Sequence, residues 1–315
     1  MGLVPKPLQA TLERKLQALN RLRPLPRTAV SKLREHFKLE MTYNSNAIEG
    51  NSLTLKETFL VLHEGITIKG KPLKDHLEAK DHHAALDYLY ELVGRDTRVT
   101  VSEHLICTLH QIITRETERE MAGRYRESNV MIGGAAHTPP DALDVPDHMR
   151  VLIQWLHAHQ KTLHPVEFAA LLHHRLVHIH PFLDGNGRTA RLFMNLVLMK
   201  SGYPLVVILK NDRRKYYRVL SAADSGHLLP LVQFIAQAVE RSLNIYLKAL
   251  TPISKPREVF LPLSEIAKKS PYSAKYLNLL ARHGRIESHK EGRVWLTSHE
   301  ALQRYQAGRQ RARKV

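Results

Sequence analysis

Apolar residues recur at helical spacing along most of this chain. Between Leu8 and Leu22 they fall at positions i, i+3, i+4 and i+7, and Pro24 ends the segment because proline cannot continue a helix. The same spacing predicts further helices at about residues 28–42, 74–92, 102–114, 146–159, 166–179, 188–200, 213–223 and 229–250. The pattern therefore indicates a mainly α fold built as a helical bundle.

The stretch from residue 123 to residue 140 breaks this pattern. It starts at Gly123, contains Val130 and Ile132, and includes the pairs Gly133–Gly134 and Pro139–Pro140. Apolar residues bounded by glycines and prolines predict a short β-hairpin. A lone hairpin is marginally stable in water, so we expect it to lean on the helices.

Residues 251–262 contain three prolines and predict a linker. Beyond it the pattern predicts two short helices and then two short strands, at about 264–269, 273–283, 285–287 and 293–297. This order of elements predicts a small C-terminal winged helix-turn-helix domain over residues 263–315.

Composition narrows the class of protein. The 315 residues are 43% apolar, which is enough for a packed interior, and no apolar run reaches the length of a membrane span. The N-terminus lacks the apolar region of a secretory signal, and Cys107 is the single cysteine, which excludes an internal disulfide. We therefore expect a cytoplasmic protein without a membrane segment.

The chain is strongly basic, with a net charge of +17. Residues 255–315 hold 14 lysines and arginines against 5 acidic residues, which leaves +9 on this last part of the chain. Such an excess favours polyanionic partners, such as nucleotides, nucleic acid and acidic protein surfaces. A solvated surface without a partner explains the charge of the tail equally well.

A glycine-rich turn followed by a helix predicts a phosphate site. Gly185, Asn186 and Gly187 permit consecutive backbone N–H groups to point into one concavity at the positive end of that helix. Arg188 and Arg191 are three residues apart, so both can face the same anion. Taken alone, a Gly-Asn-Gly sequence is more often an ordinary turn.

Two further groups lie next to this turn. Asp184 offers a hard oxygen ligand, which beside a polyphosphate would hold Mg²⁺. His180 has the intrinsic pKa of a base that removes a proton from a hydroxyl, although a single histidine at a helix end is usually a cap. All these groups within residues 180–191 predict a phosphotransfer site.

At residues 180–191 the chain resembles the Fic family, because every fixed position of the signature H-x-F-x-D/E-G-N-G-R-x-x-R is matched. The second glycine of the turn also separates it from the related kinases of the Doc type. The resemblance covers about residues 35–250. It implies a Fic-type helical bundle with a hairpin flap, and a protein adenylyltransferase that moves AMP from ATP with Mg²⁺ onto a Ser, Thr or Tyr hydroxyl of a protein.

The resemblance also implies a role for each of the signature residues. It implies that His180 is the catalytic base, that Asp184 binds Mg²⁺, and that the Gly185–Gly187 amides hold the α and β phosphates. Arg188 and Arg191 then bind the outer phosphates, and diphosphate leaves. Positioning and charge neutralisation are what such a transfer requires.

Residues 45–50 resemble the family's inhibitory motif, S/T-x-x-x-E-G/N, with Ser45 and Glu49 at its fixed positions. The resemblance implies that Glu49 pairs with Arg191 and keeps the γ-phosphate of ATP from its productive position. Because related enzymes use this glutamate to remove AMP, deAMPylation is a further expectation. Without the family, Glu49 is only the last residue of a helix.

The stretch 123–140 is similar to the family's flap, a hairpin that holds the target by strand addition. The resemblance places Ile132, Gly133 and Gly134 at the nucleotide and along this edge. The pair of glycines would let the backbone of a target approach closely.

Three more residues lie where relatives contact the adenosine, namely Tyr216, Tyr217 and Asp224. Some relatives have asparagine at the last of these positions. The two tyrosines are equally consistent with the hydrophobic core.

The matches predict how the chain is divided. The expected units are N-terminal helices with the inhibitory motif, a catalytic core with the flap and the signature loop, a linker and a winged-helix-like tail, over residues 1–110, 111–250, 251–262 and 263–315.

Several alternatives stay open from the sequence. A Fic enzyme could use another nucleotide donor, or the chain could be a nucleotide-sensing regulator that binds DNA through residues 263–315, although an intact His180 counts against a pure sensor. The protein target is not identified, and self-modification and a homodimer are open. His173, His174 and His178 lack the spacing of a zinc motif, so no zinc site is expected.

Overall fold

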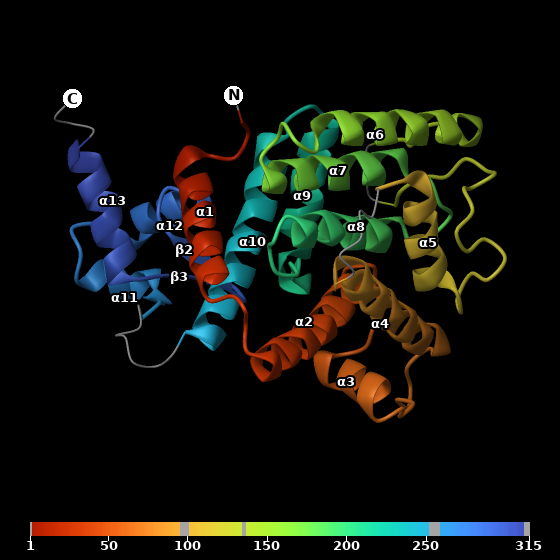
Figure 1. Ribbon diagram of the computed structural model, residues 1–315, viewed down its shortest axis with the longest axis horizontal. Helices are drawn as coiled ribbons and strands as arrows, with labels where there is room; N and C mark the ends of the chain where they lie inside the picture. The colour runs from red at the N-terminus through yellow and green to blue at the C-terminus, as the bar shows by residue number, and fades with distance from the viewer. Residues whose placement is uncertain (1, 95–100, 134–136, 252–258, 312–315) are drawn as a thin grey trace.

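A computed structural model describes residues 2–94, 101–133, 137–251 and 259–311, and it is mainly helical (Figure 1). The helices are α1 Lys6–Arg21, α2 Arg27–Ile48, α3 Leu55–His63, α4 Leu73–Gly94, α5 Glu103–Thr114, α6 Val145–His159, α7 Pro165–Ile179, α8 Asn186–Lys200, α9 Arg213–Asp224, α10 Leu229–Leu250, α11 Leu263–Lys268, α12 Ala274–Arg282 and α13 His299–Arg311, with 3₁₀ turns η1 Ala142–Asp144 and η2 Lys210–Asp212. Most of the body was predicted from the helical spacing, with ends that differ by one to three residues. None of the helices in the described ranges is long and apolar enough to cross a bilayer.

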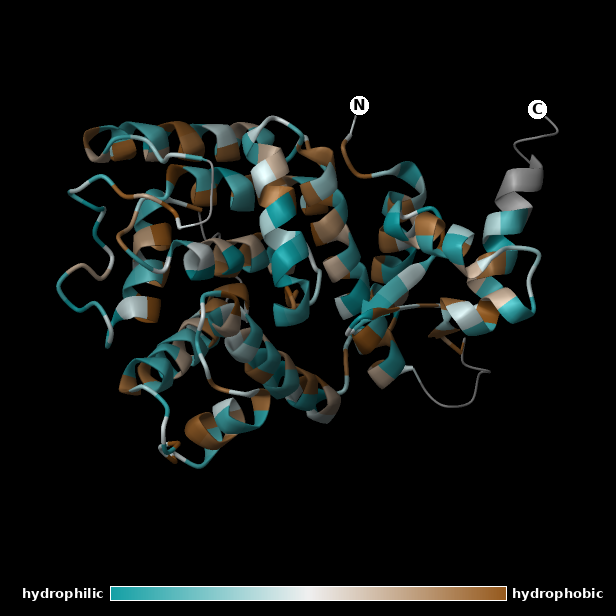
Figure 2. Ribbon diagram, turned by 180° about the vertical axis from the view of Figure 1, so that it is seen from behind, coloured by the Kyte–Doolittle hydropathy of each residue, from teal (hydrophilic) through white to brown (hydrophobic). Residues whose placement is uncertain are grey.

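The centre of the body is α8, which packs against α2, α4, α5 and α7. Its residues are buried on every side from Asn186 to Met199, apart from the half-buried Gly187. The surrounding helices turn one apolar face inward, and their ribbons are striped brown and teal (Figure 2). The helix that begins at the signature loop is therefore enclosed, and any charged side chain on it needs a buried partner.

Helix α2 is longer than the sequence pattern predicts. An end near Thr42 is wrong, because the helix continues through the polar residues that follow to Ile48. These polar side chains are buried and make tertiary hydrogen bonds; the amide oxygen of Asn44, for example, accepts from the backbone N–H of Lys210 at 2.8 Å. The inhibitory motif therefore lies in the last turn of α2 and the residues that follow it, and Gly50, at φ 107°, takes the chain out of the helix.

The predicted hairpin at residues 123–140 is not formed by the described part of that segment. Residues 123–133 and 137–140 contain no strand, and Gly134 lies outside the described residues. The segment instead loops over the surface, and Asn129 joins its two ends by donating to Asp141 at 2.9 Å and accepting from the N–H of Ala142 at 2.8 Å. Hydrogen bonds from side chains thus replace the ladder that the sequence predicted.

The tail contains a three-stranded antiparallel sheet in the order β1-β3-β2. Its strands are β1 Leu261–Pro262, β2 Ser288–Glu291 and β3 Val294–Thr297, with Leu261 and Ser288 both opposite Thr297. Strand β1 lies in the stretch expected to be a linker, and β2 begins three residues later than predicted. Helix α13 was not expected, because its sequence carries little apolar periodicity.

The tail packs beside α1 and α10, on the side of the body away from α5 (Figure 1). Lys15 of α1, which is buried, lies 2.8 Å from Glu240 of α10 and 3.0 Å from Glu287 of the tail. Arg14 and Arg304 also pair with Glu287. The tail has its own apolar cluster around Trp295 and Leu277, but this buried charge network ties it to the first helix of the body.

Candidate active site

The signature loop begins with an unusual backbone conformation. His180 ends α7 at φ 51° and ψ 58°, and it is the one non-glycine residue in the described ranges with positive φ. Gly185 follows at φ 75° and starts α8. Asn186 holds the loop between them, because its amide accepts from the N–H of Phe182 at 2.9 Å and donates to the C=O of Phe182 at 2.8 Å. The side-chain amide of Asn186 therefore binds the main chain of the loop, and the backbone N–H of Asn186 lies in the first turn of α8.

His110 of α5 packs against the signature loop and binds its main chain. The ring of His110 stacks on Phe182 with centroids 3.7 Å apart and planes 4° apart. Its Nδ1 accepts from the N–H of Gly123 at 2.9 Å, so its Nε2 carries the proton and donates to the C=O of Asp184 at 2.9 Å. Burial lowers the pKa of His110 to about 4, which keeps the ring neutral. Sequence reasoning missed this residue, because nothing in its neighbourhood distinguishes it from a core histidine.

Arg188 and Arg191 are both almost fully buried, at 1% exposed. Arg188 lies 3.0 Å from a carboxylate oxygen of Glu78 in α4, and it donates to Asp184 at 3.1 Å. Such charges are stable inside a protein only when they are paired and hydrogen-bonded. Two guanidinium groups in the first turns of α8 make this place strongly attractive to an anion.

The partners of Arg191 come from the inhibitory motif. Its Nε donates to the hydroxyl of Ser45 at 2.9 Å, and its Nη2 donates to the C=O of Ser45 at 2.9 Å and lies 2.7 Å from the carboxylate of Glu49. Burial opposes the charge on Arg191, but the carboxylate of Glu49 outweighs it and raises the pKa of the guanidinium. The ion pair expected from the sequence is formed.

Gly187 does not adopt the positive φ that a glycine permits. Of the two glycines in the turn, Gly185 alone has positive φ, and Gly187 lies within α8. A Cβ added at Gly187 would lie 2.3 Å from Oε1 of Glu49 and 2.9 Å from Nη1 of Arg191. A side chain at this position would therefore push against the carboxylate of Glu49 and the guanidinium of Arg191.

Asp184 lies beside Arg188 with its side chain 40% exposed. It accepts from the N–H of Gly185 at 2.5 Å and from Arg188, and Lys74 lies 3.4 Å away. Burial alone would raise the pKa of Asp184, but Arg188 and the Gly185 amide hold it below its ordinary value. An ionised, accessible carboxylate next to an anion site fits a hard divalent cation, which would compete with the flexible Lys74.

The side chain of His180 is partly buried, and the charges of Glu49 and Arg126 act on it. Burial lowers its pKa; the carbonyl of Val177 partly offsets this effect, and the charge of Arg126 adds to it. The imidazole is therefore neutral near pH 7 and able to accept a proton.

Known proteins resemble this chain in sequence and in fold. A family model described as Fic/DOC family matches residues 100–198, which include the signature loop. The structure of a fragment of Fic-1 from C. elegans is 31% identical, with a TM-score of 0.71, over 78% of this chain and 72% of that chain. A crystal structure of a Fic domain containing signaling protein from Bacteroides thetaiotaomicron is 32% identical, with a TM-score of 0.70, over 79% of this chain and 100% of that one. This chain belongs to the Fic/DOC family.

The curated relatives carry a functional name. "Protein adenylyltransferase Fic" of Drosophila yakuba is 33% identical over 292 residues, which are 90% of this chain and 58% of the relative. The protein of the same name from Drosophila virilis is 36% identical over 244 residues. The chain thus spans little more than half the length of the curated relatives it matches.

The two tyrosines expected at the adenosine lie in this Fic protein beside the inhibitory pair. Tyr216 is buried, and its hydroxyl forms a hydrogen bond with Nε2 of His173 at 2.9 Å and accepts from Nη1 of Arg191 at 3.5 Å. Tyr217 is 38% exposed, and its hydroxyl lies 3.5 Å from the carboxylate of Glu49. Tyr216 is therefore part of the core next to Arg191, and Tyr217 is exposed enough to contact a ligand.

Asp224 lies apart from the tyrosines, within a group of histidines. It accepts from Nε2 of His174 at 2.9 Å and from Nδ1 of His178 at 3.1 Å. The ring of His178 stacks on His137 with centroids 3.7 Å apart, and a cavity of about 550 Å³ is lined in part by Asp224, His174 and His178. His137, His178 and Asp224 offer metal-ligand atoms within 4.8 Å of one another, a grouping that the sequence spacing did not suggest.

The flap of this Fic protein is described only in part. Ile132 is half-buried and Gly133 is exposed, and their contact with the nucleotide stays a prediction. Gly134, which was expected with them, lies outside the described residues.

Proposed function

We propose that this chain is a protein adenylyltransferase, which transfers AMP from ATP with Mg²⁺ to a Ser, Thr or Tyr hydroxyl of a protein, and that Glu49 restrains it. The observation that carries the proposal is the buried Arg191 at the anion site, held by a carboxylate from another helix. The name of the curated relatives supports it. Self-modification is one form that the reaction takes when the acceptor belongs to the chain itself.

The proposed chemistry follows from the charges at the loop. His180 takes the proton from the hydroxyl, whose oxygen bonds to the α-phosphorus, while the bond from that phosphorus to the diphosphate breaks. The backbone N–H groups of residues 185–187 and the guanidinium of Arg188 neutralise the phosphates. Asp184 would hold Mg²⁺ together with phosphate oxygens, and the cation would supply further charge neutralisation.

The proposed restraint is competition for one guanidinium. The carboxylate of Glu49 occupies the donors of Arg191 that would otherwise meet the outer phosphate of ATP. Its position also suits it to orient a water on AMP-modified protein, so deAMPylation belongs to the same proposal.

The test is transfer of label from α-labelled ATP to protein. Four proteins are compared: wild type, Glu49→Gly, Glu49→Gly with His180→Ala, and Glu64→Gly. Glu64 is a matched control, because it is also an exposed glutamate at a helix C-cap but lies at the end of α3. Label should rise with Glu49→Gly, vanish in the double variant and stay at the wild-type level with Glu64→Gly. Absence of label in every lane would overturn the proposal in favour of another nucleotide donor, which labelled UTP and CDP-choline would identify.

We propose a second role for the tail, because four basic residues of α12 and of the loops on either side of β2 are exposed, namely Lys275, Arg282, Arg285 and Arg293. They favour contact with the phosphates of DNA through residues 263–315. A gel shift that weakens with salt and survives His180→Ala would support this role, and no shift at low salt would exclude it. The cytoplasmic location, the division of the chain into units and a homodimer remain predictions; light scattering tests the last.

A further inference from the structure

One buried arginine lies outside the signature and the inhibitory motif. Arg126 is 2% exposed, and the described residues place no carboxylate within ion-pair distance of it. Its Nε donates to the C=O of His180 at 2.9 Å, its Nη1 to the C=O of Ser128 at 3.1 Å, and its Nη2 to the C=O of Pro140. All three acceptors are main-chain carbonyls, one of the signature loop and two of the flap segment.

These acceptors are the start of the signature loop and the two ends of the flap segment. The main chain of Arg126 adds a fourth link, because its N–H donates to the C=O of Pro181 at 2.9 Å. A planar guanidinium with five fixed N–H donors can hold three carbonyls at once, whereas the single ammonium of a lysine cannot hold the same geometry.

The contact with His180 meets a physical need at that residue. A left-handed conformation is costly for a residue with a side chain, and it turns the carbonyl of His180 away from the helix. Nε of Arg126 gives this carbonyl a buried partner, so the conformation that aims the imidazole is stabilised from outside the helix. Without the partner, a buried acceptor would be left unpaired.

We propose that Arg126 is a positioning residue. It holds the main chain of His180 against the base of the flap, so that the imidazole keeps a fixed position relative to the acceptor hydroxyl that the flap binds. The proposal rests on the proposed transfer of AMP. The phosphate side of the site has separate supports in Asn186 and His110, and Asn129 closes the flap ends without Arg126. Loss of the arginine should therefore disturb the base and the acceptor far more than the binding of ATP.

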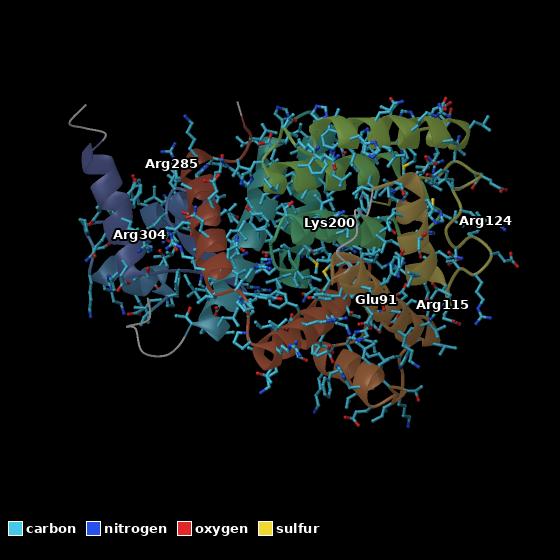
Figure 3. The ribbon with its side chains drawn as sticks, in the orientation of Figure 1. Glu91, Arg115, Arg124, Lys200, Arg285 and Arg304 are labelled. Carbon is cyan, nitrogen blue, oxygen red and sulfur yellow. The ribbon has the colours of Figure 1, made fainter. Side chains whose placement is uncertain are left out.

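The experiment uses the Glu49→Gly protein as the parent and adds Arg126→Met, Arg126→Lys or Arg124→Met. Arg124 is a matched control, because it lies two residues earlier and is exposed (Figure 3). Arg126→Met should lower kcat by about tenfold or more while KM for ATP changes by less than about threefold, and Arg126→Lys should restore only part of kcat. Arg124→Met should match the parent in both constants.

A second readout does not need activity. Burial, the charge of Arg126 and that of His137 lower the pKa of His180, while Glu49 and the carbonyl of Val177 oppose them. Removing the charge should raise the pKa of His180 in Arg126→Met and leave it nearly unchanged in Arg126→Lys. Histidine NMR in the otherwise unaltered chain measures this pKa, and His180→Ala assigns the signal.

The outcomes separate the two proposals. An inactive parent would refute the transfer reaction, and a raised pKa of His180 in Arg126→Met would still support its contact with the arginine. The positioning role is overturned if kcat is unchanged in Arg126→Met, or if kcat, ATP binding and thermal stability fall together by similar factors. It is also overturned if the pKa of His180 does not respond.

Discussion

Replacing Glu49 by glutamine should make the free protein less stable and its complex with ATP relatively more stable. The substitution keeps the size of the side chain and avoids the extra backbone entropy of glycine at this helix C-cap. It removes the charge that lies 2.7 Å from the buried Arg191. The guanidinium then lacks its counter-charge until a phosphate arrives.

The magnitude follows from burial. Arg191 is 1% exposed, and a hydrogen bond between charged groups is worth about 1.5–3 kcal/mol. The side chain of Glu49 is 30% exposed, so water screens part of its charge and the lower half of that range applies. We expect the free energy of unfolding to fall by about 1.5–2 kcal/mol, which lowers Tm by roughly 3–8 °C for a domain of this size.

Thermal unfolding with and without saturating ATP and Mg²⁺ measures both effects. Wild type should show a small shift with ATP, because the nucleotide must displace Glu49 from Arg191. Glu49→Gln should start lower and shift further, since ligand stabilisation grows with affinity. Ser45→Ala provides a comparison, because it removes one acceptor of Arg191 but keeps the carboxylate.

Two results would refute this reasoning. An unliganded Glu49→Gln protein as stable as wild type would mean that the ion pair contributes nothing. An ATP shift no larger than that of wild type would mean that Glu49 does not compete with the nucleotide, whatever its distance from Arg191.

Two further predictions concern the tail and the signature loop. Burial raises the pKa of Glu287, but the charges of Lys15, Arg14 and Arg304 outweigh burial and lower this pKa to about 2. The carboxylate therefore stabilises the fold fully above the ordinary pKa of a glutamate, and this stabilisation is lost as the pH falls towards 2. Glu287→Gln should therefore destabilise by up to about 3 kcal/mol at pH 7 and by less than half of that, about 1 kcal/mol, at pH 3 in urea unfolding. The exposed Glu265→Gln should change little at either pH, and equal losses for Glu287→Gln at both pH values would contradict the pKa. Gly185→Ala should cost about 2–3 kcal/mol, because φ is 75° and the new Cβ would meet Thr114 at 3.0 Å. Gly226→Ala, at φ 86° with nothing within 4 Å, should cost only the backbone part of this, and equal costs for the two variants would show that the contact with Thr114 is immaterial.

Local patterns in the sequence predicted the helices and the residues of the signature loop. Periodic apolar residues identify α1 and α10 because each buries one face, and the glycine-rich turn is contiguous in the chain. The end of α2 was mispredicted, since Ser45 is polar and is kept helical by Arg191, 146 residues away. Local propensity contains no information on such a partner.

The supports of the site were missed for a similar reason. His110 and Arg126 act through contacts with residues 54 to 74 positions further along the chain. Neither belongs to a short motif, and each resembles an ordinary core or surface residue when read in sequence. The group around Asp224 was missed because His137 comes from the flap and His178 from α7.

The packing of α1 has a consequence for how the chain folds during synthesis. Its packing partner is α10, which begins at Leu229, and the carboxylate that pairs with Arg14 is 273 residues away. At about 5–20 residues per second, more than 200 residues take roughly 10–40 s to make. The apolar face of Leu8, Leu12 and Leu19 is therefore made long before the residues that cover it. During that interval it is a natural place for a ribosome-associated chaperone to bind.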